Sequence, residues 1–349
     1  MTEATLPGLE TVEPPAMPEN ERTPWIERGP QKRLMLVAGR SNPALAEAIA
    51  EKLGIMLGEV ELKTFANGET YVRYRESIRG CDVFIVQSGN APVNDHLVEL
   101  LIMIQAAKLA SAKRITAVIP WFPYSRQDKK SAPREPITAR LVADALESAG
   151  VDRVVTMDLH AGQIQGFFST PVDHMTALQL FAQYYRDKGL SGEDVVAVSP
   201  DVGRAKFARR FAQMLEADLA ILNKTRPEHD RAEVTEVIGE VEGKIALMID
   251  DMILTGGTLI AGGAALREAG ASQVYACATH GLFPGNAFDK IGASELTQVT
   301  VTDTVPIDPL KRPDNVDVLP VSGLLAETIM NIFADDSVSA IFAGENQLF

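Results

Sequence analysis

The residues best suited to chemistry lie in the segment 247–258, where an apolar stretch ends in two adjacent acids and a turn rich in glycine and threonine. Asp250 and Asp251 end the apolar stretch, which we expect to be a β-strand, and open α/β sheets bind ligands beyond the carboxyl ends of their strands. The turn and the helix expected after it offer backbone N–H groups and two hydroxyls to a phosphate. The residues of this predicted site are Asp250, Asp251, Thr255, Gly256, Gly257 and Thr258. An ordinary strand–turn–helix with a capping acid is the alternative.

Two other segments offer groups that suit a nucleotide. Arg126 carries a planar guanidinium that can bind phosphate through two hydrogen bonds, and Gln127 carries an amide that suits a base or a hydroxyl. Phe65, Asn67 and Glu69 combine an aromatic face with two hydrogen-bonding side chains, a set suited to an adenine. From chemistry alone, a solvated basic loop and a β-turn at Asn67 remain open alternatives.

Four more residues are candidates for metal binding and catalysis. His160 and Asp201 each follow an apolar run, where a side chain can project into a cleft. Lys224 and Arg226 follow the apolar residues 219–222, and on a mobile loop they would add positive charge over a polyphosphate. Taken alone, a single histidine is more often a packed or surface residue, and a Lys-Thr-Arg run has no special meaning.

The elements that must position these residues alternate between short apolar runs and helical stretches. Runs at 34–38, 82–87, 115–119 and 153–157 are expected to be strands, with helices between them. The same alternation repeats from about residue 177 to residue 278, so we predict an α/β protein of two doubly wound, mainly parallel sheets in tandem. We expect a disordered extension at 1–31, domains at 32–178 and 179–330, and a C-terminal segment at 331–349 that packs on the first domain.

Composition excludes several classes of protein. The chain has 349 residues, 46% of them hydrophobic, which is enough for two domain cores. Its formal net charge of −14 argues against broad nucleic-acid binding but permits a locally basic pocket. No apolar run approaches the ~20 residues that span a bilayer, and the start is acidic and proline-rich, so we expect neither membrane insertion nor export and place the protein in the cytoplasm.

Residues 247–258 resemble the phosphoribosyl-binding loop of the phosphoribosyltransferase superfamily. Other segments resemble one family within it, the ribose-phosphate diphosphokinases, also called phosphoribosyl pyrophosphate synthetases. The resemblance runs from about residue 33 to the C-terminus, and the residues before it have no counterpart there. The segments that carry it most clearly are 65–69, 123–130, 134–139 and 156–168.

The resemblance implies an enzyme that moves the diphosphoryl group of ATP to the C1 hydroxyl of ribose 5-phosphate, giving 5-phospho-α-D-ribose 1-diphosphate and AMP for nucleotide, histidine and tryptophan biosynthesis. It assigns ATP to Phe65, Asn67, Glu69, Arg126 and Gln127, Mg²⁺ to His160 and Asp201, and catalysis to Lys224 and Arg226. It assigns ribose 5-phosphate to the predicted site in residues 250–258. The aromatic loop at 65–69 would serve a neighbouring subunit, and a homohexamer is implied.

The resemblance also implies a regulatory site for phosphate or ADP between subunits. An arginine with hydroxyls makes a reasonable anion pocket, whereas chemistry alone would favour a surface serine turn. The residues assigned to it are Ser77, Arg79, Arg134, Asp173, Ser337 and Ser339.

Two positions depart from the family pattern. Leu254 stands where an aspartate is usual, which removes a carboxylate beside the phosphate turn. Arg204 stands where a glycine is frequent and adds a charge near the predicted metal. Two alternatives therefore stay open: a phosphoribosyltransferase, which would leave the ATP segments unused, and a non-catalytic regulatory homologue, which only Leu254 favours.

Overall fold

The structure is a computed structural model that describes residues 25–27, 32–225 and 233–342. Of the predicted residues, Arg226 lies outside these ranges, and so does most of the 1–31 extension. The chain divides into two compact units, one formed by residues up to Met175 together with those from Val321 onward, the other by Thr176–Pro320. We consider each unit separately.

The first unit is built on a sheet that has the strand order β1-β2-β5-β6-β7-β8 among the described residues. Every neighbouring pair from β2 to β8 is parallel, and β1 pairs antiparallel with β2. A separate antiparallel hairpin joins β3 to β4. The strands are β1 Trp25–Glu27, β2 Arg33–Ala38, β3 Val60–Thr64, β4 Thr70–Tyr74, β5 Cys81–Val86, β6 Arg114–Ile119, β7 Arg153–Met157 and β8 Val172–Met175.

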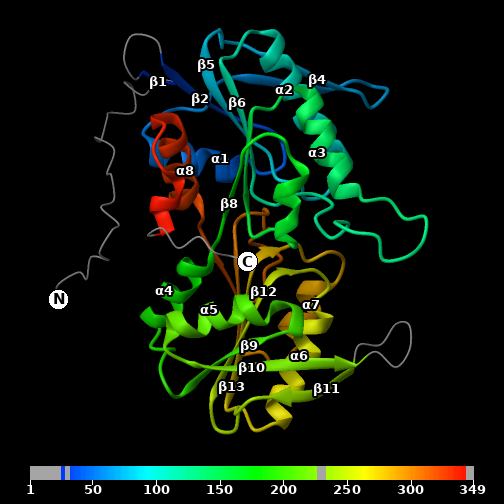
Figure 1. The fold of residues 1–349 in the computed structure, drawn as a ribbon, viewed down its shortest axis with the longest axis vertical. Coiled ribbons are helices and arrows are strands. Elements are labelled where there is room, and N and C mark those ends of the chain that lie inside the picture. Colours follow the sequence, from blue (N-terminus) through cyan, green and yellow to red (C-terminus); the bar gives the residue numbers. More distant parts are fainter. Residues whose placement is uncertain (1–24, 28–31, 226–232, 343–349) are drawn as a thin grey trace, which may run out of the picture. The chain divides into compact units, whose positions relative to one another are not determined.

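Helices cover both faces of this sheet. Alternate strand residues point to opposite sides, and both sets are apolar and buried. Met35 and Val37 of β2 share an apolar core with α2 and α3, while Leu34 and Leu36 are equally buried toward the other face. On that face α1 packs against α8 (Figure 1). The helices are α1 Pro43–Leu53, α2 Val93–Leu109, α3 Thr138–Ala149 and α8 Ser322–Ala334, with 3-10 turns η2 Gly162–Phe167 and η4 Val338–Phe342.

The second unit is built on a sheet with the order β11-β10-β9-β12-β13-β14-β15 in the described part of the chain. All neighbours are parallel except β10 and β11. The strands are β9 Val195–Ser199, β10 Asp218–Thr225, β11 Glu233–Ile238, β12 Ile245–Ile253, β13 Gln273–Gly281, β14 Gln298–Thr302 and β15 Val316–Leu319.

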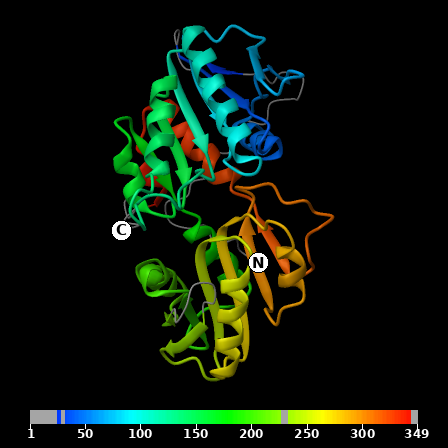
Figure 2. The same cartoon turned by 90° about the vertical axis from the view of Figure 1, so that its right-hand side faces the viewer.

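This sheet also lies between two helical layers (Figure 2). The apolar core on one face joins Val196 and Met248 to Leu259 and Leu266 of α6. On the other face α4 packs against α5, and α5 packs against β9. The helices are α4 Leu178–Asp187, α5 Ala205–Leu215, α6 Gly257–Glu268 and α7 Ala287–Gly292, with the 3-10 turn η3 Val202–Arg204. The expected class of two mainly parallel, doubly wound sheets is confirmed.

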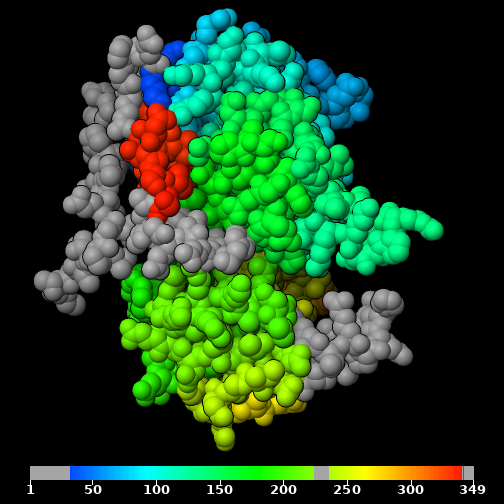
Figure 3. Space-filling model, in the orientation of Figure 1, coloured from blue at the N-terminus to red at the C-terminus, as the bar shows by residue number. Residues whose placement is uncertain are grey.

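Three details differ from the sequence analysis. The extension expected to be disordered contains β1, whose residues pair with β2. The chain passes to the second unit after Met175 rather than after residue 178, and it returns at Val321 rather than 331, because α8 is one continuous helix that packs on α1. Figure 3 shows α8, in red, against blue residues from the start of the first unit.

The third difference concerns the segment that carries Lys224. We expected a strand at 219–222 followed by a mobile loop, but β10 continues to Thr225 and pairs with β11, a strand that the sequence analysis missed. The register shifts between Asn223 and Lys224, as in a β-bulge. The backbone of Lys224 therefore belongs to a strand, whereas Arg226 lies outside the described residues.

No helix in the described ranges is long and apolar enough to cross a membrane.

Candidate active site

The predicted phosphate turn of the second unit follows β12 directly. Asp250 and Asp251 are on the last part of this strand, and α6 starts at Gly257 after a turn in which Thr255 is exposed. Gly256, just before the helix, has a φ of 75°, and a Cβ there would come within 3.1 Å of Ile291. A glycine is therefore required at 256 both for its backbone conformation and for space.

The amino end of α6 is suited to an anion. Its first N–H groups have no partner within the helix, and no side chain caps them among the described residues. Gly257 and Thr258 are exposed at this end. Because the helix dipole adds partial positive charge there, the turn can bind a phosphate through backbone groups and the two threonine hydroxyls.

The two acids next to this turn share one cation. Nη2 of Arg204 lies 2.6 Å from Oδ2 of Asp251, and its Nε lies 3.7 Å from Oδ1 of Asp250. The backbone N–H of Asp251 donates to Oδ1 of Asp250 at 2.8 Å. Burial, followed by the neighbouring charge of Asp251, raises the pKa of Asp250 well above its ordinary value, while Arg204 opposes that rise. Within the described ion pairs, Arg204 thus serves both acids.

Asp201 occupies the turn that carries this arginine. It follows β9, the neighbour of β12 in the sheet, and Oδ1 of Asp201 accepts a hydrogen bond from the backbone N–H of Arg204 at 3.0 Å. Gly203 leaves room for this carboxylate, because a Cβ there would lie 3.1 Å from the same oxygen. Asp201 and Arg204 therefore follow one strand, β9, and Asp250 and Asp251 lie at the end of its neighbour, β12.

In the first unit the aromatic loop predicted for ATP is the turn of the β3–β4 hairpin. Phe65 is 52% exposed, and its ring contacts that of Tyr71 at a centroid distance of 5.7 Å. Oδ1 of Asn67 accepts a hydrogen bond from the N–H of Glu69 at 3.3 Å. The turn that we kept as an alternative thus exists, and it presents the aromatic face, the amide and the acid toward solvent.

The other ATP candidates come after β6. Arg126 and Gln127 are exposed. The N–H of Gln127 donates to Tyr124 O at 2.9 Å, and its Oε1 accepts from the Thr138 hydroxyl at 2.5 Å, which ties this loop to the start of α3. His160 follows β7, at the same carboxyl edge of the sheet, and is half-buried. The preceding Asp158 has a φ of 32°, an unusual backbone conformation for a residue other than glycine.

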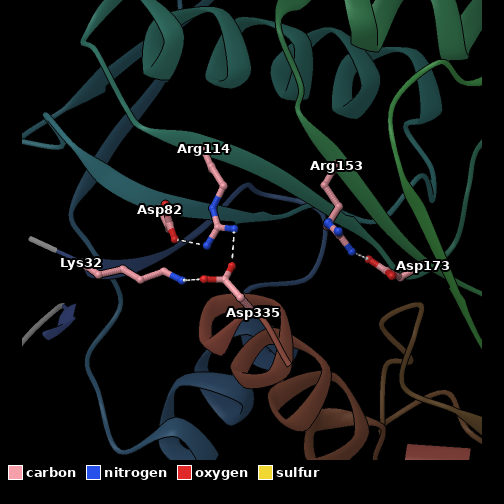
Figure 4. Close-up of polar contacts among 6 residues, drawn as sticks. All are labelled: Lys32, Asp82, Arg114, Arg153, Asp173 and Asp335. Carbon is pink, nitrogen blue, oxygen red and sulfur yellow. Dashed lines mark hydrogen bonds and ion pairs between the residues drawn. The ribbon is translucent and has the colours of Figure 1, made fainter. Parts of the chain in front are cut away.

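Of the predicted regulatory residues, Ser337 and Ser339 contact each other. The described contacts do not join all six into one site within this chain. The hydroxyls of Ser337 and Ser339 are 2.7 Å apart. Nη1 of Arg153 lies 2.7 Å from Oδ2 of Asp173, and Asp335, just before the two serines, is bound by Lys32 and Arg114 (Figure 4). The exposed residues Ser77, Arg79 and Arg134 make no described contact with this group.

Sequence reasoning missed the ion pairs made by Arg204 and the whole Lys32–Arg114–Asp335 cluster. The signal for the first was present, because an arginine in place of a small residue near two acids suggests an ion pair. The second joins residues more than two hundred positions apart, and no local pattern reveals it.

A doubly wound parallel sheet in which a strand ends in two acids and leads through a glycine-rich turn into a helix is typical of phosphoribosyltransferase-like proteins. Residues 34–150 match the N-terminal domain of ribose phosphate pyrophosphokinase, and residues 224–343 match the phosphoribosyl synthetase-associated domain. A ribose-phosphate pyrophosphokinase from Fusobacterium nucleatum is 50% identical over 307 residues, which cover 88% of this chain and 97% of that protein. The chain belongs to the ribose-phosphate pyrophosphokinase family.

Two further comparisons bear on its extent. The crystal structure of phosphoribosylpyrophosphate synthetase from Mycobacterium smegmatis matches with a TM-score of 0.81 and 47% identity over 86% of this chain and 99% of that one. The ribose-phosphate pyrophosphokinase of Synechococcus elongatus is 48% identical over 341 residues, or 97% of this chain and 98% of that protein. This alignment is longer than residues 33–349, so the expectation that the extension has no counterpart in the family is wrong.

Proposed function

We propose that this chain transfers the diphosphoryl group of ATP to the C1 hydroxyl of ribose 5-phosphate and releases AMP. The observation that carries the proposal is the arrangement at the end of β12, where two acids precede an uncapped helix start in a chain of this family. A phosphate at the start of α6 would leave the sugar hydroxyls within reach of the acids, which accept hydrogen bonds when ionised.

In this proposal Arg126 and Gln127 bind the phosphates and base of ATP, with Phe65, Asn67 and Glu69 contributed by the hairpin turn. The turn is exposed and connects two short strands, so it is accessible to a second copy of the chain. This supports the proposed homohexamer, in which Phe65 would stack on the adenine of a neighbouring subunit.

Magnesium is the proposed cofactor, held by His160 and Asp201. The described residues contain no group of three or more His, Cys, Asp or Glu side chains arranged for a metal. A sparse set still suits Mg²⁺, because this ion keeps several waters and takes oxygen ligands from nucleotide phosphates. Asp201 fits this role, since its capping bond uses one oxygen and a carboxylate has two. Bound Mg²⁺ would neutralise charge on the transferred group.

Catalysis then depends on positioning and on positive charge rather than on a covalent intermediate. Lys224 and Arg226 are the proposed cations over the transferred group, acting with Arg126. The backbone register shift between Asn223 and Lys224 supports a site at this strand end, because β-bulges are over-represented next to active sites. We further propose that phosphate or ADP binds at Ser77, Arg79, Arg134, Asp173, Ser337 and Ser339 contributed by different subunits.

The reaction is tested by its nucleotide product. Purified chain incubated with ATP, MgCl₂ and ribose 5-phosphate should release AMP in equal amounts with 5-phosphoribosyl diphosphate, measured by anion-exchange chromatography. Release of ADP alone would refute the proposal. Product formed only when a nucleobase and 5-phosphoribosyl diphosphate are supplied would favour a phosphoribosyltransferase.

The role of the loop cation is tested by Lys224→Ala. We expect turnover to fall by about 10²–10³-fold, the usual loss when a charge that stabilises the transition state is removed, with little change in the dissociation constant for ribose 5-phosphate. The matched control is Lys311→Ala, an exposed lysine of the same unit that is paired with Asp308. A loss of ground-state affinity at unchanged turnover would contradict the catalytic role.

A further inference from the structure

Arg204 places a cation beside Asp250 and Asp251, the acids proposed to bind the sugar. The glycine that is frequent at this position would not supply this charge. Nη2 of Arg204 lies 2.6 Å from Oδ2 of Asp251, and its Nε lies 3.7 Å from Oδ1 of Asp250. The side chain is 19% exposed and that of Asp251 is 3% exposed, so their ion pair is largely shielded from water. Such a pair is much less screened than a surface pair, and loss of one partner leaves a buried charge unpaired.

The backbone around Arg204 fixes where this guanidinium starts. Arg204 ends the η3 turn, its N–H is held by the Asp201 carboxylate at 3.0 Å, and α5 begins at the next residue. The turn follows β9, which lies beside β12 in the sheet, so the arginine reaches the acids from the adjacent strand end. An arginine held this way at both ends has little freedom to leave the acids.

The two acids would otherwise disfavour each other. They are consecutive on one strand, and the charge of Asp251 acts against ionisation of Asp250. To accept hydrogen bonds from two sugar hydroxyls, the two acids must keep a fixed orientation. The guanidinium faces one oxygen of each carboxylate, Oδ2 of Asp251 and Oδ1 of Asp250, and so limits how either acid can turn.

The geometry points to Arg204 as a positioning residue for ribose 5-phosphate, which holds Asp250 and Asp251 oriented toward the sugar hydroxyls. This inference rests on the proposed function, because the sugar is the ligand of the acids only in that reaction. Arg204 itself acts through the acids and has no role in the phosphoryl transfer. Its removal should therefore change sugar binding far more than turnover.

The test compares Arg204→Gln with the natural chain in steady-state AMP release. We expect the KM for ribose 5-phosphate to rise about tenfold, the equivalent of one hydrogen bond to a charged group, while kcat and the KM for ATP change less than about twofold. Calorimetric titration with ribose 5-phosphate alone should show the same loss of affinity. Arg204→Lys should recover part of it, since lysine restores the charge but not the fork.

The matched control is Arg186→Gln, which removes the same charge from α4 in the same unit, where Arg186 bonds only to Gln183 and the Met214 carbonyl in the described contacts. Its KM for ribose 5-phosphate should not change. An unchanged or lower KM in Arg204→Gln overturns the inference, and a lower value would mean that the arginine competes with the sugar. If Arg204→Gln does not fold, Arg204→Lys decides: a KM about threefold higher supports the inference, since lysine loses the fork, and an unchanged KM refutes it.

These results separate the inference from the proposed function. A natural chain that releases no AMP contradicts the proposed function, whatever the variants do. An active natural chain whose KM is insensitive to Arg204 contradicts the inference alone.

Discussion

Two arginines in this chain each connect a pair of acids, in different units and with different results. Arg114 contacts buried Asp82 and, at 2.7 Å, the exposed Asp335, which also lies 2.5 Å from Lys32 (Figure 4). Arg204 contacts Asp251 and Asp250. In the first cluster two described cations match two acids, and the members come from distant parts of the sequence. In the second, the described ion pairs place one cation beside two consecutive acids.

The difference lies in how each cluster affects the pKa of its acid. The balanced cluster lowers the pKa of Asp335 to about 2, through hydrogen bonds from Lys32 and Arg114, so its acid is ionised without any ligand. The unbalanced cluster raises the pKa of Asp250, mainly through burial and then through Asp251. An acid pair with one described cation gains more from donors supplied by a ligand than a pair that is already balanced.

The largest expected effect comes from breaking the unbalanced pair. Asp251→Asn should lower kcat/KM for ribose 5-phosphate by about a hundredfold, since a charged hydrogen-bond acceptor is worth up to ~3 kcal/mol. The measurement is AMP release at low ribose 5-phosphate.

Breaking the balanced pair should have the opposite signature. Asp82→Asn should reduce the unfolding free energy by about 2 kcal/mol, because it removes a buried partner of Arg114, and should leave kcat/KM within about twofold. Urea unfolding followed by tryptophan fluorescence reports on the first unit, since Trp25 and Trp121 both belong to it. Equal losses of activity in the Asp82 and Asp251 variants would remove the distinction between the clusters.

A smaller effect is expected from adding an acid beside the unbalanced pair. Leu254→Asp restores the usual family residue, and we expect a modest change in the KM for ribose 5-phosphate, at most the ~1.5–3 kcal/mol of one charged hydrogen bond. The natural chain should already be active, because the backbone groups of the phosphate turn do not depend on this side chain. Activity found only in Leu254→Asp, or only after mixing with an authentic synthetase, would identify a regulatory homologue.

Stability should respond to pH in opposite ways at the two clusters. Because the folded pKa of Asp250 lies above its ordinary value of 3.8, the folded chain loses stability as pH rises from that value toward the raised pKa. At pH 7.5 the unfolding free energy of Asp250→Asn should therefore be about 1 kcal/mol higher than that of the natural chain. This gain should vanish below pH ~4. Circular dichroism in urea at both pH values measures it. A gain of equal size at both would rule out ionisation as its cause.

The smallest expected effect concerns Asp335, which is 63% exposed. Its depressed pKa stabilises the fold above pH 3.8, and this contribution is lost as pH falls through about 2. Asp335→Asn should lower the unfolding free energy by less than ~1 kcal/mol near neutral pH, and salt should reduce the difference. Tryptophan fluorescence is again the readout, and a difference that persists at pH 2 would contradict the ionic origin.

The fold was predictable to the extent that its strands are apolar and local. The parallel strands β2, β5, β6 and β7 and the helices α2 and α3 follow directly from periodicity and from Gly and Pro positions. β11 and the end of β10 were missed, because polar pairs such as Asn223 with Glu236 and Thr225 with Glu233 interrupt the apolar pattern there.

The site was predictable in parts for a similar reason. Asp250, Asp251 and the turn to Thr258 are contiguous, so their chemistry is visible in one segment. The contact of Arg204 with those acids depends on β9 lying beside β12, and strand order is a property of the whole sheet. The assignments of His160, Lys224 and Arg226 depended on family resemblance and stay predictions.

The return of the chain at Val321 has a consequence for biosynthesis. Leu325, Ile329 and Phe333 of α8 are fully buried in the first unit, although more than a hundred residues of the second unit are translated before them. A nascent chain that has just finished the second unit still exposes an apolar face of the first. The domain that is synthesised first is thus completed last, and a chain cut short before α8 leaves that face open to chaperones and proteases.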